Sequence, residues 1–252
     1  DALPISEDSP RWNLREVIYI EDPMQPLRDL TDAEVVPSFT SAFELLGHIR
    51  KCEFAVGTDS KVYEYKETVT ERDGRILYEL VRETQASLAI EIGFEKGTST
   101  LHLLQGIKDN GAGLVITLDP MQLSFAHGVG LRNVERSGLS SFHQFIPCRS
   151  EFALPKLLEA GLRCNFAFID GNHLFDQTML EAYYIDKMLQ KDSLMAFHDR
   201  WMPSIRSVAA WLCSNLPYRE VERDSDDLIV LQKTADDTRH WSDFTSFIVP
   251  EE

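Results

Sequence analysis

Short apolar runs alternate along this chain with longer segments whose apolar residues recur at helical spacing. Five runs predict buried parallel strands at residues 88–92, 114–118, 142–146, 165–169 and 194–197. Helical spacing predicts helices at 38–51, 70–84, 98–107, 130–137, 150–158, 177–189 and 204–216. Two further runs at 218–222 and 228–231 flank an acidic turn, which predicts a terminal antiparallel hairpin. The alternation predicts an α/β fold: a doubly wound, mostly parallel seven-stranded sheet with helices on both faces.

The chain divides into three predicted regions. Residues 1–69 form an N-terminal extension, whose first 37 residues hold five prolines with little periodicity and should wrap over the core. Residues 53–66 of this extension predict a loop or a weak strand. The main domain covers residues 70–233, and a C-terminal tail covers 234–252. The helix at 38–51 could cover a substrate pocket, or equally well be a packing helix or an oligomer contact.

The strand at 88–92 leads into a turn with two glycines and then into a helix. Gly93 and Gly97 carry no Cβ, so they allow a tight turn and a close approach of the backbone to a ligand. Thr98 and Ser99 are good N-caps for the helix that follows. The next strand ends at Asp119, whose carboxylate could accept hydrogen bonds from ribose hydroxyls. A strand, a glycine turn and a helix N-terminus together predict a site for a nucleotide-like ligand.

The order Glu91-x-Gly93-x-x-x-Gly97, followed by Asp119, resembles the first two motifs of class I S-adenosylmethionine (SAM) methyltransferases. A dinucleotide-binding fingerprint needs a glycine where Glu95 stands, so a nicotinamide cofactor is disfavoured. SAM carries no phosphate, and an acidic loop suits its sulfonium. The resemblance implies a Rossmann-like methyltransferase fold with SAM as the cofactor. The residues that it places at the cofactor are Glu91, Gly93, Phe94, Gly97, Thr98, Ser99, Asp119, Ser150 and Asp170.

Polar residues also follow the fourth and fifth predicted strands. Asp170 ends one of them, with His173 three residues later, and His198 and Asp199 end the other. Because the carboxyl ends of parallel strands meet at one edge of a sheet, these side chains should lie close to the glycine turn. Two carboxylates and a histidine suit a divalent cation, and His173 could take a proton near neutral pH. The same residues could instead form a hydrogen-bonded loop network.

Over residues 70–216 the resemblance extends to small-molecule O-methyltransferases of the cephalosporin-biosynthesis, macrolide-sugar and catechol types. It is carried by the glycine turn, Asp119 and the segments 168–173 and 197–203. It implies that Asp170 and Asp199 bind Mg²⁺. The catechol-type motif continues with Asn where Arg200 stands, so His198 would be the third ligand or the site would hold no metal. We expect catalysis to use Asp170, His173 and His198.

Composition favours a small molecule as the acceptor. The net charge of −16 argues against a nucleic-acid partner, and no apolar run reaches membrane-spanning length. Four cysteines without metal-like spacing indicate reduced thiols in a cytoplasmic protein, and a homo-oligomer is compatible with the pattern. The expected function is SAM-dependent O-methylation of a small-molecule hydroxyl, with or without Mg²⁺. The alternatives are an NAD(P)-dependent oxidoreductase and a non-catalytic nucleoside-binding protein.

Overall fold

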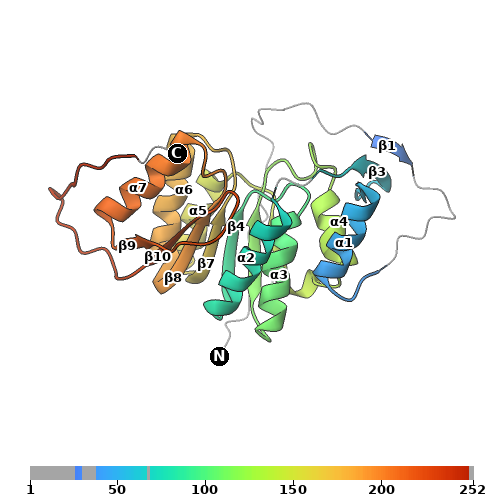
Figure 1. The fold of residues 1–252 in the computed structure, drawn as a ribbon, viewed down its shortest axis with the longest axis horizontal. Coiled ribbons are helices and arrows are strands. Elements are labelled where there is room, and N and C mark those ends of the chain that lie inside the picture. Colours follow the sequence, from blue (N-terminus) through green and yellow to red (C-terminus); the bar gives the residue numbers. More distant parts are fainter. Residues whose placement is uncertain (1–25, 30–37, 67–68, 250–252) are drawn as a thin grey trace.

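A twisted sheet of seven strands runs through the computed structural model, which describes residues 26–29, 38–66 and 69–249 (Figure 1). Its strands lie in the order β6-β5-β4-β7-β8-β10-β9. The first five in this order are parallel, and β10 is antiparallel to both of its neighbours. The strand bounds are β4 Leu88–Ile92, β5 Leu114–Leu118, β6 His143–Ile146, β7 Cys164–Ile169, β8 Leu189–Phe197, β9 Tyr218–Glu220 and β10 Ile229–Lys233. The predicted doubly wound fold with a terminal antiparallel hairpin is confirmed.

The described chain has seven α-helices, which cover both faces of the sheet. Both faces need this cover, because successive side chains of each buried strand point to opposite faces. In β7, Phe166 and Phe168 face α1–α4, whereas Ala167 and Ile169 face α5–α7. Both sets are fully buried, so the strand has no solvated side. The helix bounds are α1 Ala42–Cys52, α2 Glu71–Glu83, α3 Thr98–Asp109, α4 Val129–Arg136, α5 Ser150–Glu159, α6 Phe175–Met188 and α7 Pro203–Asn215.

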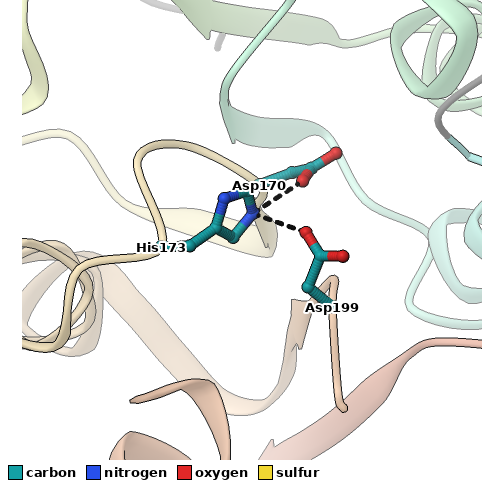
Figure 2. A group of neighbouring side chains, drawn as sticks. All are labelled: Asp170, His173 and Asp199. Carbon is teal, nitrogen blue, oxygen red and sulfur yellow. Dashed lines mark hydrogen bonds and ion pairs between the residues drawn. The ribbon is translucent and has the colours of Figure 1, made fainter. Parts of the chain in front are cut away.

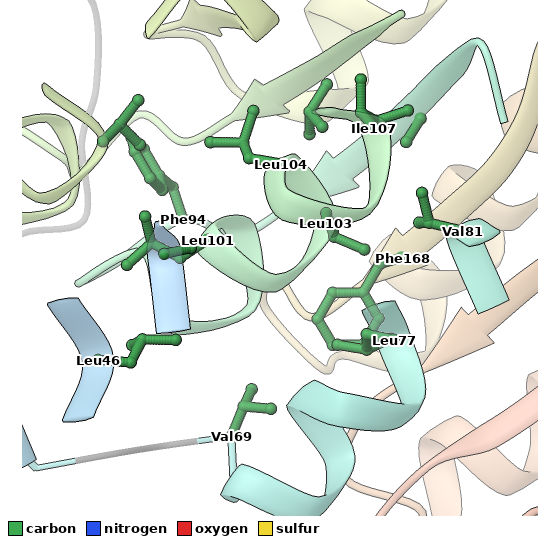
Figure 3. Close-up of a cluster of buried hydrophobic side chains, with 14 of the residues drawn as sticks. Leu46, Val69, Leu77, Val81, Phe94, Leu101, Leu103, Leu104, Ile107 and Phe168 are labelled. Atoms are coloured by element: carbon green, nitrogen blue, oxygen red, sulfur yellow. The ribbon is translucent and has the colours of Figure 1, made fainter. Parts of the chain in front are cut away.

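The core on the α1–α4 face includes side chains from the N-terminal extension. Leu46 of α1 is fully buried in the same cluster as Leu77 of α2 and Leu103 of α3 (Figure 3). Burying such a leucine side chain contributes about 1.5–3 kcal/mol. The described part of the extension is therefore packed onto the main domain through apolar contacts.

A small three-stranded sheet lies beside α1, with the strand order β1-β3-β2. The bounds are β1 Pro26–Asp29, β2 Phe54–Val56 and β3 Lys61–Glu64. The prediction of a loop or weak strand at 53–66 thus missed a hairpin, because its strands are too short for an apolar alternation to stand out. The ring of Tyr63 in β3 stacks on His127 at a centroid distance of 4.7 Å, which fixes this hairpin against the loop after β5. Most of residues 1–37, predicted to wrap over the core, lie outside the described residues.

Two further features of the described chain concern its helices and its cysteines. None of its helices combines the length and the apolar character that crossing a membrane requires. All four cysteines are free thiols, and Cys148 and Cys164 are buried. The cytoplasmic location inferred from the cysteines stays a prediction.

His102 on α3 is a histidine whose ring lies in the core. It is fully buried, and neither ring nitrogen has a hydrogen-bond partner within the described residues. A Cβ on Gly74 of α2 would overlap its ring, so no space remains there for water. Burial lowers the pKa of His102 to about 3, and the charges of Arg50 and Arg75 act in the same direction. The folded state therefore holds this ring neutral.

We expect acid to destabilise the protein through His102. Its folded pKa is depressed, so the stabilisation is present above about pH 6.5 and is lost as the pH falls towards 3. At about pH 4.5 the loss is roughly 2.5–3 kcal/mol, since each pH unit below the unfolded pKa costs about 1.4 kcal/mol until the folded pKa is reached. Urea unfolding at pH 7 and 4.5 should show a smaller acid effect in His102→Leu than in the parent. The exposed His240→Leu is the control, and an equal acid effect in all three proteins would contradict the prediction.

Candidate active site

The last rungs of the parallel ladder align the predicted site residues along one edge of the sheet. The N–H of Gly93 donates to Leu118 O at 3.0 Å, and the N–H of Asp170 donates to Ile92 O at 2.9 Å. The N–H of His198 then donates to Ile169 O at 3.2 Å. The ends of β5, β4, β7 and β8 are therefore in register. The glycine turn lies directly beside the cluster of carboxylates and histidines.

Glycine is required at both positions of the turn after β4. Gly93 has a φ of +93°, and a Cβ there would overlap the carbonyl oxygen of Asp170. Gly97 has a φ of +79°, and a Cβ there would lie 3.0 Å from the ring of Phe94. The Phe94 ring itself is buried in the core against Phe145, at a centroid distance of 5.6 Å. A ligand can thus meet Phe94 only through its backbone.

Asp119 at the end of β5 holds the glycine turn in place. Its Oδ2 accepts from the N–H groups of Phe94 at 3.1 Å and Glu95 at 2.9 Å, and its Oδ1 accepts from Met121 N at 2.7 Å. A carboxylate offers about four acceptor positions, so capacity remains for a ligand hydroxyl. The sequence predicted a ribose partner here but not this bracing of the loop.

Glu91 lies fully buried at the foot of the turn. Its two oxygens accept from Ser99 Oγ at 2.5 Å and Thr100 Oγ1 at 2.6 Å. Burial raises the pKa of Glu91 to about 8, against the effect of these two hydrogen bonds. The prediction of Thr98 and Ser99 as N-caps is wrong: the N-cap of α3 is Gly97, in a left-handed conformation. The buried carboxylate draws the Ser99 hydroxyl away from the helix end, and Thr98 bonds instead to the hydroxyl of Tyr65.

Two histidines and two aspartates meet beyond β7 and β8, and Figure 2 draws three of them, Asp170, His173 and Asp199. His173 Nε2 lies 3.2 Å from Asp170 Oδ1 and 2.9 Å from Asp199 Oδ2. His198 Nδ1 lies 3.4 Å and 3.5 Å from the same two oxygens. His173 and Asp199 both adopt a positive φ, at +55° and +56°. Such backbone strain persists where the surrounding structure enforces it, and it is concentrated at functional sites.

The charges of this cluster compensate one another. Burial opposes protonation of both histidines, but the hydrogen bond to Asp170 and the charges of Asp170 and Asp199 raise the pKa of each above its ordinary value. For His198 the pKa rises to about 9. The pKa of Asp170 is lowered, since its bonds to His173 and His198 outweigh its burial. Without a cation, the two carboxylates favour the protonated form of each histidine over the neutral form.

Within the described chain, two groups of three side chains bring possible metal ligands within 4.8 Å of one another. The first contains Asp170, His173 and Asp199, and the second contains His198, Asp199 and Asp227. The predicted set of Asp170, His198 and Asp199 is thus divided between them, although His198 Nδ1 contacts both aspartates. Asp227 was missed because it lies in the acidic turn before β10, and only the insertion of β10 beside β8 brings it here.

The hydrogen bonds that orient other side chains at this edge left no signal in the sequence. Trp201 Nε1 donates to Asp199 Oδ1 at 2.8 Å and so orients that carboxylate. Ser150, the predicted cofactor residue at the start of α5, donates its hydroxyl hydrogen to Glu181 of α6 at 2.6 Å. Glu181 lies 31 positions from Ser150, and an acidic residue inside a predicted helix indicates a solvated face unless the packing is known. Tyr65 reaches the turn from the N-terminal extension.

Part of this chain is similar in sequence to known methyltransferases. Residues 90–200 match the family model of a methyltransferase domain. A catechol O-methyltransferase of Niastella koreensis is 29% identical over 106 residues, which are 42% of this chain and 46% of that protein. The chain therefore spans about half the length of this curated relative.

Solved structures share the fold at low identity. The O-methyltransferase from Bacillus cereus, in complex with SAH, superposes with a TM-score of 0.59 at 16% identity, over 79% of this chain and 93% of that one. TomG from Streptomyces achromogenes, an O-methyltransferase involved in tomaymycin synthesis and in complex with SAM, gives 0.60 at 16% identity, over 83% and 92%. With the family match, these likenesses confirm the resemblance to class I methyltransferases.

Proposed function

We propose that this chain, whose residues 90–200 match a methyltransferase domain, transfers a methyl group from SAM to a hydroxyl oxygen of a small molecule. One observation carries the proposal: the glycine turn contacts the cluster formed by Asp170, His173, His198 and Asp199 (the acidic cluster), because Gly93 abuts the carbonyl of Asp170. A methyl donor bound on the turn then has its reactive end beside groups that can bind a hydroxyl and take its proton. No comparison supports a nicotinamide-dependent oxidoreductase.

The cofactor lies along the edge of the sheet in this proposal. Gly93 and Gly97, with the backbone of Phe94, leave room for the methionine part. Glu91 and the first turn of α3, with Thr98 and Ser99, flank the same part. Asp119 accepts from the ribose hydroxyls, Ser150 meets the adenine, and Asp170 borders the site on the side of the transferred methyl group. As that group moves, its bond to sulfur breaks while its bond to the acceptor oxygen forms.

His173 is the base in this scheme. Its Nε2 faces Asp170 and Asp199, so the hydrogen on that nitrogen is shared with the carboxylates. Nδ1 makes no hydrogen bond within the described residues and is the atom that can accept the hydroxyl proton. The His173 side chain is 24% exposed, against 6% for His198, so it can pass this proton to solvent.

We assign a divalent cation to Asp170, His198 and Asp199. The fit rests on the donors: His198 Nδ1 lies 3.4 Å and 3.5 Å from the two carboxylates, and its buried Nε2 has no partner in the described structure. Since one donor is an imidazole, the set suits an ion that accepts nitrogen better than it suits Mg²⁺, which prefers oxygen. A bound cation would lower the pKa of an acceptor hydroxyl.

Removal of the metal should therefore abolish methyl transfer. We expect exhaustive chelation to eliminate turnover, and Mn²⁺ to restore it at a lower concentration than Mg²⁺. Elemental analysis of the purified protein, before and after chelation, gives the matching metal content. Undiminished activity in a protein with no detectable metal would leave these residues as hydrogen-bonding groups.

Residues 1–69 form a lid in this proposal, over the main domain 70–233, and residues 234–252 are a tail. The support comes from the described part of the extension. The Tyr65 hydroxyl bonds to Thr98 in the first turn of α3, and Lys96 Nζ donates to the carbonyl of Lys66 at 3.2 Å. Tyr65 and Lys66 thus lie beside the glycine turn and the start of α3, where they can cover a bound ligand.

Ligand-dependent stability tests the proposed function directly. We expect SAM and S-adenosylhomocysteine to raise the melting temperature, and NAD and NADP to leave it unchanged, with and without Mg²⁺ or Mn²⁺. A ligand at 100 times its Kd stabilises the folded state by about 2.7 kcal/mol, which corresponds to roughly 5–10 °C for a domain of this size. Catechol is the first acceptor to test for methylated product. A rise with NAD alone would overturn the proposal.

A further inference from the structure

A buried polar network joins the start of α5 to α6 beside the proposed cofactor site. Ser150 Oγ donates to Glu181 Oε1 at 2.6 Å, and Gln177 Nε2 donates to Ser150 Oγ at 2.7 Å. Gln177 Nε2 also lies 3.3 Å from Glu181 Oε1. Ser150 is 6% exposed and Glu181 only 1%, so solvent does not compete for these bonds. Gln177 Nε2 lies 3.2 Å from Glu151 Oε2 as well, and its contact with Ser150 Oγ is the shortest of the three.

The direction of these bonds leaves the Ser150 oxygen as an acceptor. A carboxylate oxygen can only accept, so the hydroxyl must give its single hydrogen to Glu181. Gln177 occupies one lone pair of the same oxygen, and one lone pair remains. Glu181 Oε2 has no partner within the described residues, so a proton taken up by this carboxyl can reside there while Oε1 still accepts. Burial raises the pKa of Glu181 to about 7, and when its proton is on Oε2 the Ser150 hydroxyl still donates to Oε1.

The position of the network matches the far end of the cofactor. β5 and β6 are adjacent strands, and Ser150 begins the helix that follows β6 at the same edge as Asp119. A Cβ on Gly171 would lie 3.4 Å from Glu181 Oε1, so the network also borders the loop after Asp170. A nucleoside whose ribose lies on Asp119 and whose sulfur lies near Gly93 points its base towards Ser150. The N–H groups of Ser150 and Glu151 have no backbone partner within the described residues and can donate to a ring nitrogen.

We infer that Glu181 is a positioning residue for base recognition: it fixes the Ser150 hydroxyl as the acceptor for the 6-amino group of adenine. This inference rests on the proposed function. The 6-amino group donates a hydrogen to the free lone pair of Ser150. A 6-oxo purine has an oxygen at that place, which would face the serine oxygen with no hydrogen between them. The arrangement thus selects adenine over hypoxanthine without any direct contact from Glu181 to the base.

The test compares two product analogues that differ at one position. S-adenosylhomocysteine carries the 6-amino group, and S-inosylhomocysteine carries a 6-oxo group. By isothermal titration calorimetry we expect the parent to bind the adenosyl compound about 10–100-fold more tightly, since the wrong group leaves buried polar atoms unpaired. Glu181→Met removes the acceptor, frees the hydroxyl to turn, and should reduce this ratio to within about threefold. Glu181→Gln retains an oxygen that can accept from Ser150 and should preserve most of the ratio.

The variants separate a positioning role from a structural one. Thr178→Val is the matched control, because it removes a buried hydroxyl one turn away on the same helix that has no partner within the described residues, and it should leave the ratio unchanged. If Glu181→Met does not fold, Glu181→Leu replaces it, and Ser150→Ala, which removes the acceptor itself, should lose the ratio as well. A ratio unchanged in Ser150→Ala or in folded Glu181→Met overturns the inference. Failure of the parent to bind either compound overturns the proposed function, and with it this inference.

Discussion

His173→Ala is expected to slow methyl transfer by about 10²–10⁴-fold, the usual effect of removing a general base. A neutral aliphatic or phenolic hydroxyl is a weak nucleophile, and His173 Nδ1 is placed to take its proton while Asp170 and Asp199 hold Nε2. SAM affinity should change little, because the imidazole lies beyond β7 and not on the glycine turn. Single-turnover transfer to the acceptor found in the methylation assay measures the chemical step, and calorimetry measures SAM binding.

The pH profile adds a second readout for His173. Its pKa is raised, so the parent should gain rate with increasing pH, in a limb that lies above pH 6.5. The variant should lack this limb. His240→Ala in the exposed tail is the matched control and should behave like the parent. Rates equal to the parent at every pH would make His173 structural, and loss of bound metal from His173→Ala would make it a ligand instead.

The strand positions were predictable because a buried parallel strand is marked by its own residues. The predicted strands at 88–92 and 114–118 coincide with β4 and β5. In contrast, β8 begins at Leu189, five residues before the predicted run. Its first half holds Gln190, Lys191 and Asp192, which are exposed, so hydropathy gives no sign of a strand there. Apolar patterning finds only the buried parts of strands.

The candidate site was predictable wherever strand ends alone determine it. Asp170, His198 and Asp199 come together because β7 and β8 are parallel neighbours, and that follows from the alternation of strands and helices. Glu181 and Asp227 depend on helix packing and on the place of an antiparallel strand, which no local pattern encodes. The N-caps at Thr98 and Ser99 were misassigned for the same reason. Local preference was overruled there by a buried carboxylate on the preceding strand.

Gly93→Ala is expected to disrupt both halves of the proposed site at once. The new Cβ would overlap the carbonyl oxygen of Asp170, so either the glycine turn or the end of β7 must move. Alanine at a φ of +93° is also strained by about 1–3 kcal/mol. Overpacking against the backbone should destabilise the fold by about 1–3 kcal/mol more. S-adenosylhomocysteine should bind at least about tenfold more weakly, since tenfold corresponds to only about 1.4 kcal/mol.

Gly111→Ala is the matched control for this change, because it separates strain from overlap. Gly111 lies beyond the end of α3 with a φ of +94°, and no atom lies within 4 Å of where its Cβ would be. Gly111→Ala should therefore be destabilised by the backbone strain alone and should keep the affinity of the parent for S-adenosylhomocysteine. Urea unfolding gives the two losses of stability, and calorimetry gives the two affinities. If both variants lose the same stability and both keep the parental affinity, the contact between Gly93 and Asp170 does not join the glycine turn to the acidic cluster.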